Sequence, residues 1–225
     1  MQQTGPGQRQ LETPRAAGLA GVVFALLLAA AIVLIRLAIP QGADAVTAPG
    51  FTNSTRRSAV QTALALVPFA GIFFLWFMGA VRAHVGAAED RFLATVFLGS
   101  GLVFTATLFG AGAAAGAVLS VAHPSGSAPP TAAWDFGRHF AYTLMVGYGM
   151  RMAAVFVSVV SAIGRRLGVL PRGLTVLGYV TSLTLLFVSP NVPWAELVFP
   201  AWSLVLSLYI LVASGRDRSR GAARA

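Results

Sequence analysis

Six long apolar stretches run along this chain and restrict it to a membrane environment. They cover Ala16–Ile39, Val60–Val81, Phe92–Val121, Phe140–Ile163, Gly173–Ser189 and Val192–Ala213. A helix needs about 20 apolar residues to cross a hydrocarbon core of about 30 Å, and the fifth stretch lies at the short limit. In lipid the backbone polar groups must be satisfied within each segment, so each stretch predicts a helix. The expected fold is all-α, a polytopic membrane bundle of six transmembrane helices.

Composition supports a single membrane domain. The chain is 56% hydrophobic and 10% charged, whereas about 25% of the residues in a soluble domain are charged. We expect a cytoplasmic N-terminal segment over 1–15, a transmembrane domain over 16–213 and a basic cytoplasmic tail over 214–225. There is no cysteine, which excludes disulfides, thiolate metal sites and cysteine nucleophiles.

Arginines concentrate in alternate connections between the predicted helices, and this bias predicts the topology. One side receives Arg56, Arg57 and Arg138. The other receives eleven: Arg9, Arg15, Arg82, Arg91, Arg165, Arg166, Arg172, Arg216, Arg218, Arg220 and Arg224. Positively charged connections stay in the cytoplasm, so both termini are predicted to be cytoplasmic. The pI of about 11.5 is then explained by anchoring near anionic lipid heads, with no nucleic-acid partner expected.

Two features refine the boundaries of these segments. The first apolar stretch is longer than the core of a signal peptide, about 7 to 15 residues, so an uncleaved helix is expected there. The segment Ala122–Arg138 contains Pro124, Pro129 and Pro130. Prolines and small polar residues favour a loop over a helix, so this segment is predicted to be a loop.

Three short segments carry a family resemblance. They are Glu89–Gly101 (EDRFLATVFLGSG), Pro14–Gly18 (PRAAG) and Leu170–Leu174 (LPRGL). Together they resemble a family of small uncharacterised six-helix bacterial integral membrane proteins, over nearly the whole chain. The resemblance implies a place in the bacterial cytoplasmic (inner) membrane, and it implies no chemical activity.

Arg151 lies at the midpoint of the fourth stretch, where an arginine costs about 2.5 to 3.5 kcal/mol. We therefore expect the bundle interior to receive it. Steps of three and four residues from Arg151 mark a small or polar face: Thr143, Gly147, Ala154, Ser158 and Ser161. The fifth and sixth stretches carry matching residues: Thr175, Gly178, Tyr179, Ser182, Glu196, Pro200, Ser203 and Ser207. These faces predict a shared polar interior between helices four to six.

Glu196 is the predicted partner of Arg151. Measured from the outer helix ends at 1.5 Å per residue, Arg151 lies about 16 Å deep and Glu196 about 6 Å deep. An arginine that extends outward can cover this difference. The pair could be structural, or it could belong to a ligand or proton pathway. The candidate ligand-binding residues are Arg151, Glu196, Ser158, Ser182, Tyr179 and Ser203.

The third predicted helix is rich in small residues. Gly112 and Gly116 form a G-x-x-x-G pair, which allows another helix backbone to approach closely. This spacing predicts either a seam inside the bundle or a contact with a second copy or another membrane protein.

Complete catalytic and metal motifs are missing from the sequence. Glu89, Asp90 and Arg91 could share acid and base roles, but adjacent residues do not face each other on a helix, and helix capping explains them better. His123 and His139 could meet across a loop, yet two histidines do not make a metal site. Gly99-Ser100-Gly101 is not the G-x-S-x-G of a serine hydrolase. No metal, cofactor or catalytic residue is therefore expected.

Two functional hypotheses remain ahead of an enzyme. The protein could handle a small anionic or amphiphilic ligand in the polar interior, because a buried arginine beside hydroxyl groups suits an anion. Alternatively, it could be a structural or accessory subunit of a membrane complex, in which the same charges only fix the helix order.

Overall fold

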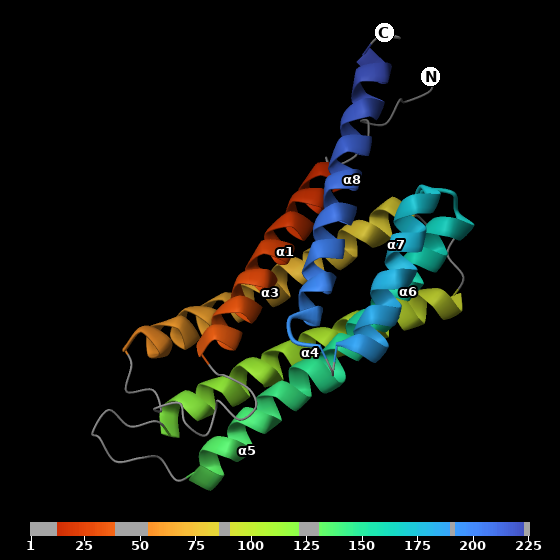
Figure 1. Cartoon of the computed structure of the whole chain (residues 1–225). Helices are drawn as coiled ribbons and strands as arrows, with labels where there is room; N and C mark the ends of the chain where they lie inside the picture. The colour runs from red at the N-terminus through yellow and green to blue at the C-terminus, as the bar shows by residue number, and fades with distance from the viewer. Residues whose placement is uncertain (1–12, 39–53, 86–90, 122–130, 190–191, 223–225) are drawn as a thin grey trace, which may run out of the picture.

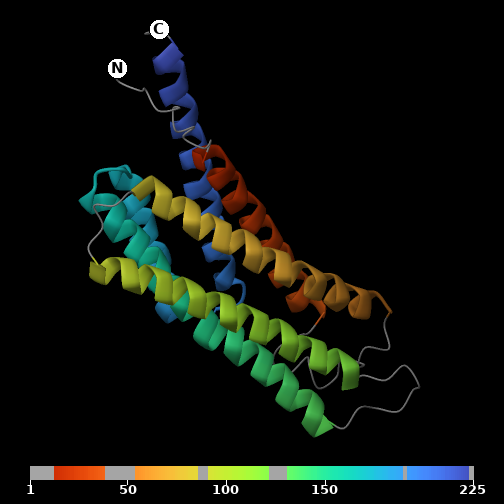
Figure 2. The ribbon, with the colours of Figure 1, turned by 180° about the vertical axis from the view of Figure 1, so that it is seen from behind.

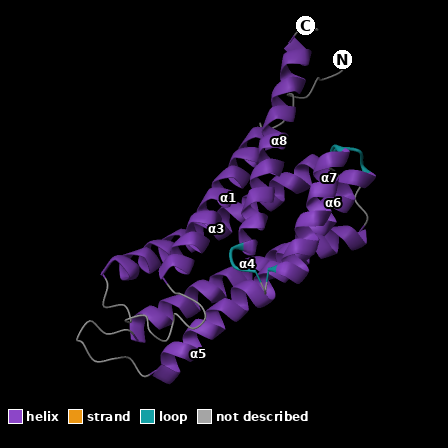
Figure 3. Cartoon of the chain, viewed as in Figure 1, coloured by secondary structure: helices purple, strands orange, loops and turns teal. Residues whose placement is uncertain are grey.

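The computed structural model describes residues 13–38, 54–85, 91–121, 131–189 and 192–222, which form a bundle of helices without a strand in these ranges (Figures 1 and 3). In chain order its elements are α1 (Thr13–Ala38), α3 (Ser54–Val85), α4 (Arg91–Val121), α5 (Thr131–Tyr142), η1 (Thr143–Gly149), α6 (Met150–Arg166), α7 (Arg172–Leu183), η2 (Thr184–Val188), η3 (Ala195–Leu197) and α8 (Val198–Ala222).

The predicted all-α membrane bundle is confirmed. Five helices are long and apolar enough to cross a membrane: Gly18–Ala38, Thr55–Arg82, Arg91–Ser120, Ala132–Arg166 and Ala195–Ser214. The fifth predicted helix is present as α7 and η2, and it is the short one, Arg172–Val188. The chain is therefore a multi-pass membrane protein that faces a lipid bilayer.

Two boundaries differ from the predictions. The helical segment before α6 begins at Thr131, so the predicted loop up to Arg138 is wrong over its last eight residues. The segment from Thr131 to Arg138 contains no proline, and the prolines of the predicted loop therefore exclude a helix only before it. At the other end of the chain, α8 continues to Ala222, well into the predicted tail, where alanine and arginine are good helix formers.

Helix α1 lies between α3 and α8, and Figures 1 and 2 both show α1 and α8 side by side. Glycines make this approach possible. A Cβ atom at Gly18 would lie 3.0 Å from the Ser207 carbonyl oxygen, and one at Gly21 would overlap the Ser207 hydroxyl. The small and polar stripe of α8 thus packs in part on α1, which the sequence analysis did not predict.

The middle of the bundle is aromatic. Six fully buried phenylalanines from five helices meet there: Phe24, Phe74, Phe77, Phe104, Phe156 and Phe199. Ring centroids lie 4.8 Å apart for Phe24 and Phe74, and 5.1 Å apart for Phe104 and Phe199. Polar groups are therefore placed around this apolar centre, not in it.

The two ends of the bundle differ in charge. At one end α3 and α6 finish while α4 and α7 begin (Figure 2), and this basic end carries Arg82, Arg91, Arg165, Arg166 and Arg172. At the opposite end α1 and α4 finish while α3 and α5 begin. We call this opposite end the pocket end, because the cavity described below lies close to it.

Candidate binding pocket

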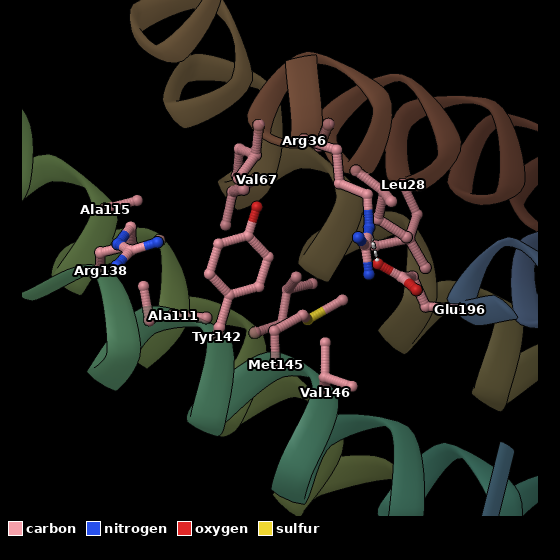
Figure 4. Close-up of a pocket in the computed structure, with 16 residues that line it drawn as sticks. Leu28, Arg36, Val67, Ala111, Ala115, Arg138, Tyr142, Met145, Val146 and Glu196 are labelled. Atoms are coloured by element: carbon pink, nitrogen blue, oxygen red, sulfur yellow. Dashed lines mark hydrogen bonds and ion pairs between the residues drawn. The ribbon is translucent and has the colours of Figure 1, made fainter. Parts of the chain in front are cut away.

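A cavity lies toward the pocket end, between α1, α3, α4, α5, η1 and η3 (Figure 4). About 590 Å³ of space, including its open mouth, is unfilled by protein atoms. Its walls are mostly apolar, and four side chains bring polar or charged groups to it: Arg36, Arg138, Tyr142 and Glu196. Apolar walls with few polar groups are typical of ligand pockets.

Arg36 and Glu196 form an ion pair in this pocket. Arg36 lies near the end of α1 and its Nε donates to Glu196 Oε1; the two side chains are 10% and 3% exposed. The predicted pair between Arg151 and Glu196 is therefore wrong. The sequence contains the signal for the observed pair, because Arg36 lies three residues from the end of its apolar stretch, about 4.5 Å, close to the depth of Glu196.

Arg151 is exposed, and its guanidinium donates to the carbonyl of Gly147 on the same helical segment. The chain between Tyr142 and Met150 forms a π-helix, in which the Met150 N–H bonds to the Met145 carbonyl. A face counted at 3.6 residues per turn is not continuous through such a wide turn. The prediction that Arg151 points into the bundle interior is therefore wrong.

Aromatic rings enclose the Arg36 guanidinium. Its Cζ lies 5.8 Å from the ring centre of Tyr142 and 5.7 Å from that of Trp194, both within the range of a cation–π interaction. Trp194 has a φ of 71°, a left-handed conformation that is strained for a large side chain. The backbone thus holds the Trp194 ring beside Arg36 despite this strain.

Arg138 lies on the other side of the pocket from the Arg36–Glu196 pair, with Tyr142 between them (Figure 4). Arg138 is 8% exposed, and its Nη2 lies 3.2 Å from Asp135 Oδ1. The Asp135 side chain is 56% exposed, so this carboxylate approaches from outside the cavity. One cavity is therefore bordered by two arginines, Arg138, which is buried, and Arg36, which is half-buried, and its lining includes a single carboxylate, Glu196.

Glu196 has remaining capacity to accept a hydrogen bond. Its second oxygen, Oε2, is buried and has no hydrogen-bond partner among the described residues. A buried acceptor without a donor costs free energy. A ligand hydroxyl in the pocket could supply that donor.

The predicted polar interior exists as a packed seam on one side of the bundle. Ser161 on α6, Gly178 and Ser182 on α7, and Trp202 on α8 form this polar seam. Ser182 Oγ donates to the Ala154 carbonyl across the helix interface at 2.8 Å. A Cβ atom at Gly178 would overlap the Ser161 hydroxyl and lie 3.2 Å from Trp202 Nε1. The helices here are in direct contact.

The remaining predicted site residues lie apart from the pocket. Ser158 is half-buried and its hydroxyl donates to the Val155 carbonyl of its own helix at 3.1 Å. Tyr179 is half-buried and Ser203 is fully buried. Of the six predicted residues only Glu196 lines the cavity. The structure replaces the others with Arg36, Arg138 and Tyr142, which the sequence analysis did not propose as site residues.

Gly112 and Gly116 face α3, as a seam inside the bundle requires. The atoms nearest to a Cβ at these positions belong to the side chains of Val67, at 3.1 Å, and Leu64, at 3.5 Å. The predicted contact with another backbone is therefore wrong, because side chains separate α3 from α4. A contact of this helix with a second copy stays a prediction.

Other sequence motifs add no second site. Within the ranges that the structure describes, no group of three or more acidic or histidine side chains could hold a metal ion. His139 Nδ1 lies 2.7 Å from the Asp135 carbonyl oxygen, while Glu89, Asp90 and His123 lie outside the described residues. Ser100 bonds to the Phe97 carbonyl of its own helix.

Comparison with known proteins gives no relative: no family model, curated protein or solved structure matches the chain.

Proposed function

We propose that this protein binds an anionic amphiphile in the pocket between Arg36 and Arg138. The observation that carries the proposal is a pair of arginines, Arg138 buried and Arg36 half-buried, that border one cavity with apolar walls. Guanidinium groups bind carboxylate and phosphate through geometrically matched hydrogen bonds. The walls, in contrast, favour an apolar body. A ligand with both parts would use the whole pocket.

The proposal places the anionic group near the guanidinium of Arg138. Arg36 already binds Glu196 closely, whereas the carboxylate beside Arg138 belongs to the exposed Asp135. A ligand phosphate could therefore approach Arg138 from the cavity side without displacing Glu196. A hydroxyl on the ligand would donate to Glu196 Oε2. A phosphate linked to a glycerol carries both groups.

The competing proposal is a structural role, in which the Arg36–Glu196 pair only fixes α1 against η3. The aromatic rings around Arg36 favour this role for that half of the site. Arg138 and the unfilled space favour binding, because a purely structural pair needs neither.

Thermal unfolding in maltoside micelles tests the binding proposal. Lysophosphatidic acid should raise the midpoint of unfolding, and lysophosphatidylcholine with the same acyl chain should not, because the choline cation leaves its head group without a net charge. Arg138→Gln should abolish the increase. Arg151→Gln is the matched control, since Arg151 is exposed outside the pocket. If lysophosphatidic acid raises the unfolding midpoint equally in Arg138→Gln and Arg151→Gln, the pocket is rejected as the binding site. If only Arg151→Gln loses the increase, the binding site is the one predicted from sequence around Arg151.

We also propose that the basic end faces the cytoplasm of a bacterium and that the pocket end faces outward across the cell membrane. The distribution of arginine supports this orientation. A reporter fused after Gly168 should be cytoplasmic, and one fused after Val121 should be external. The reverse pattern would contradict the orientation.

A further inference from the structure

A second hollow lies on the outer surface of the bundle between α3 and α4. It has about 670 Å³ of unfilled space, including its open side, and its walls are apolar. Pro68 and Ala113 are exposed there, and Phe109 is 41% exposed. In a multi-pass membrane protein, an open apolar groove between two spanning helices faces the acyl chains of the bilayer.

This groove and the pocket share a wall. Val67 and Gly112 line both of them. A Cβ atom at Gly112 would lie 3.1 Å from Val67 Cγ1. Because glycine has no Cβ atom, Val67 packs closely against the backbone of α4 at this wall. Val67 and Gly112 therefore form the wall that the charged pocket and the membrane-facing groove have in common.

We propose that the ligand is a lipid that enters sideways from the bilayer, with its acyl chain in the α3–α4 groove and its anionic head in the pocket. This inference rests on the proposed function and names the source and orientation of its ligand. Val67 moves aside to let the glycerol region pass beside Gly112. The groove extends from the middle of α3, at Pro68, toward the pocket end, where it reaches Gly116 of α4, so the lipid comes from the leaflet on that side.

The energetics favour this arrangement over a water-soluble anion. An acyl chain that remains in an apolar environment loses no hydrophobic contact when its lipid enters the groove. The head group exchanges water for guanidinium contacts in the pocket. A small hydrophilic anion would gain nothing from the groove and would face the apolar walls of the cavity.

Two alanines on α4 provide a matched test. Ala113 lines the groove, while Ala106 lies two turns away outside it, and both are exposed. Ala113→Phe should fill the groove without touching the pocket. Half-saturation of the thermal shift by lysophosphatidic acid should then need about tenfold more lipid or beyond, because the phenylalanine ring blocks the position that the acyl chain takes when its head group reaches the pocket. Ala106→Phe should leave half-saturation unchanged.

A photoactivatable lysophosphatidic acid with a diazirine on its acyl chain gives a second readout. In vesicles, the label should attach to the peptides that contain Pro68 and Phe109, and Ala113→Phe should reduce this labelling. If Ala113→Phe and Ala106→Phe reach half-saturation at the same lipid concentration, and the label attaches to other peptides, the lateral groove is overturned. The proposed pocket would still stand in that case if Arg138→Gln removed the thermal shift. Failure of lysophosphatidic acid to stabilise the unmodified protein would overturn both.

Discussion

The polar seam and the pocket both bury polar groups among apolar helices, but they differ in the space around those groups. At the seam, Gly178 lets α7 contact Ser161, and Ser182 bonds directly to α6. At the pocket, Arg36 and Arg138 border a cavity whose unfilled space, including its open mouth, is about 590 Å³. Polar side chains in direct contact hold helices together, whereas those around unfilled space can receive a ligand. Buried polar groups therefore support different roles according to the space around them.

The largest expected effect comes from the buried ion pair of the pocket. Glu196→Gln should lower the free energy of unfolding by about 3 to 5 kcal/mol, because it leaves the buried Arg36 charge without its carboxylate. Arg36→Met combined with Glu196→Met should recover part of the loss. Chemical unfolding in mild detergent would measure each variant.

A double-mutant cycle separates the two arginines that lie within apolar stretches. Arg36 and Glu196 should show a large interaction term, while Arg151 and Glu196 should act additively. An interaction term near zero for Arg36, or a large one for Arg151, would contradict the ion pair of the pocket.

An intermediate effect is expected at the seam. Gly178→Leu should destabilise the protein by about 1 to 3 kcal/mol, since the new side chain overlaps Ser161 and forces α7 from α6. Gly173→Leu, on the same helix, is the control because nothing lies within 4 Å of its Cβ position. Both variants should retain the thermal shift with lysophosphatidic acid; loss of that shift in Gly178→Leu alone would make the seam part of the binding site.

The smallest effect concerns hydrogen bonds of the helices. Ser182→Ala should cost about 0.6 kcal/mol, the average for such a bond between membrane helices. Ser158→Ala should cost less, because its hydroxyl bonds only to its own helix. The unfolding free energies of the two variants would check this order, and equal losses would remove the special role of the bond to Ala154.

Much of the fold follows from the sequence, because a long apolar run in lipid has to be a helix. The helix neighbours do not follow in the same way. The polar faces of the last three apolar stretches and the depth of Glu196 predict Arg151 as its partner. Instead, Gly18 and Gly21 bring α1 against α8 and place Arg36 within reach of Glu196.

Local geometry accounts for the other differences. The π-helix before α6 changes the face on which Arg151 lies. No pattern of proline or glycine in the sequence predicts this π-helix. Arg138 was counted with a loop because prolines precede it, yet it lies in α5 and points to the pocket. The candidate site therefore loses Arg151 and gains Arg138, and Glu196 is the predicted site residue that lines the cavity.

The absence of cysteine from the natural chain allows the most direct test of the pocket. Met145→Cys places one thiol in the cavity wall, and Ala133→Cys places one on the exposed surface of α5 as a reference. Their reaction rates with a sulfonate and an ammonium methanethiosulfonate reagent can be compared. Relative to Ala133→Cys, the anionic reagent should be favoured at Met145→Cys by about tenfold or more, because two arginines focus a positive potential there. Lysophosphatidic acid should slow that reaction, whereas a preference for the ammonium reagent, or no protection by the lipid, would contradict an anion-binding pocket.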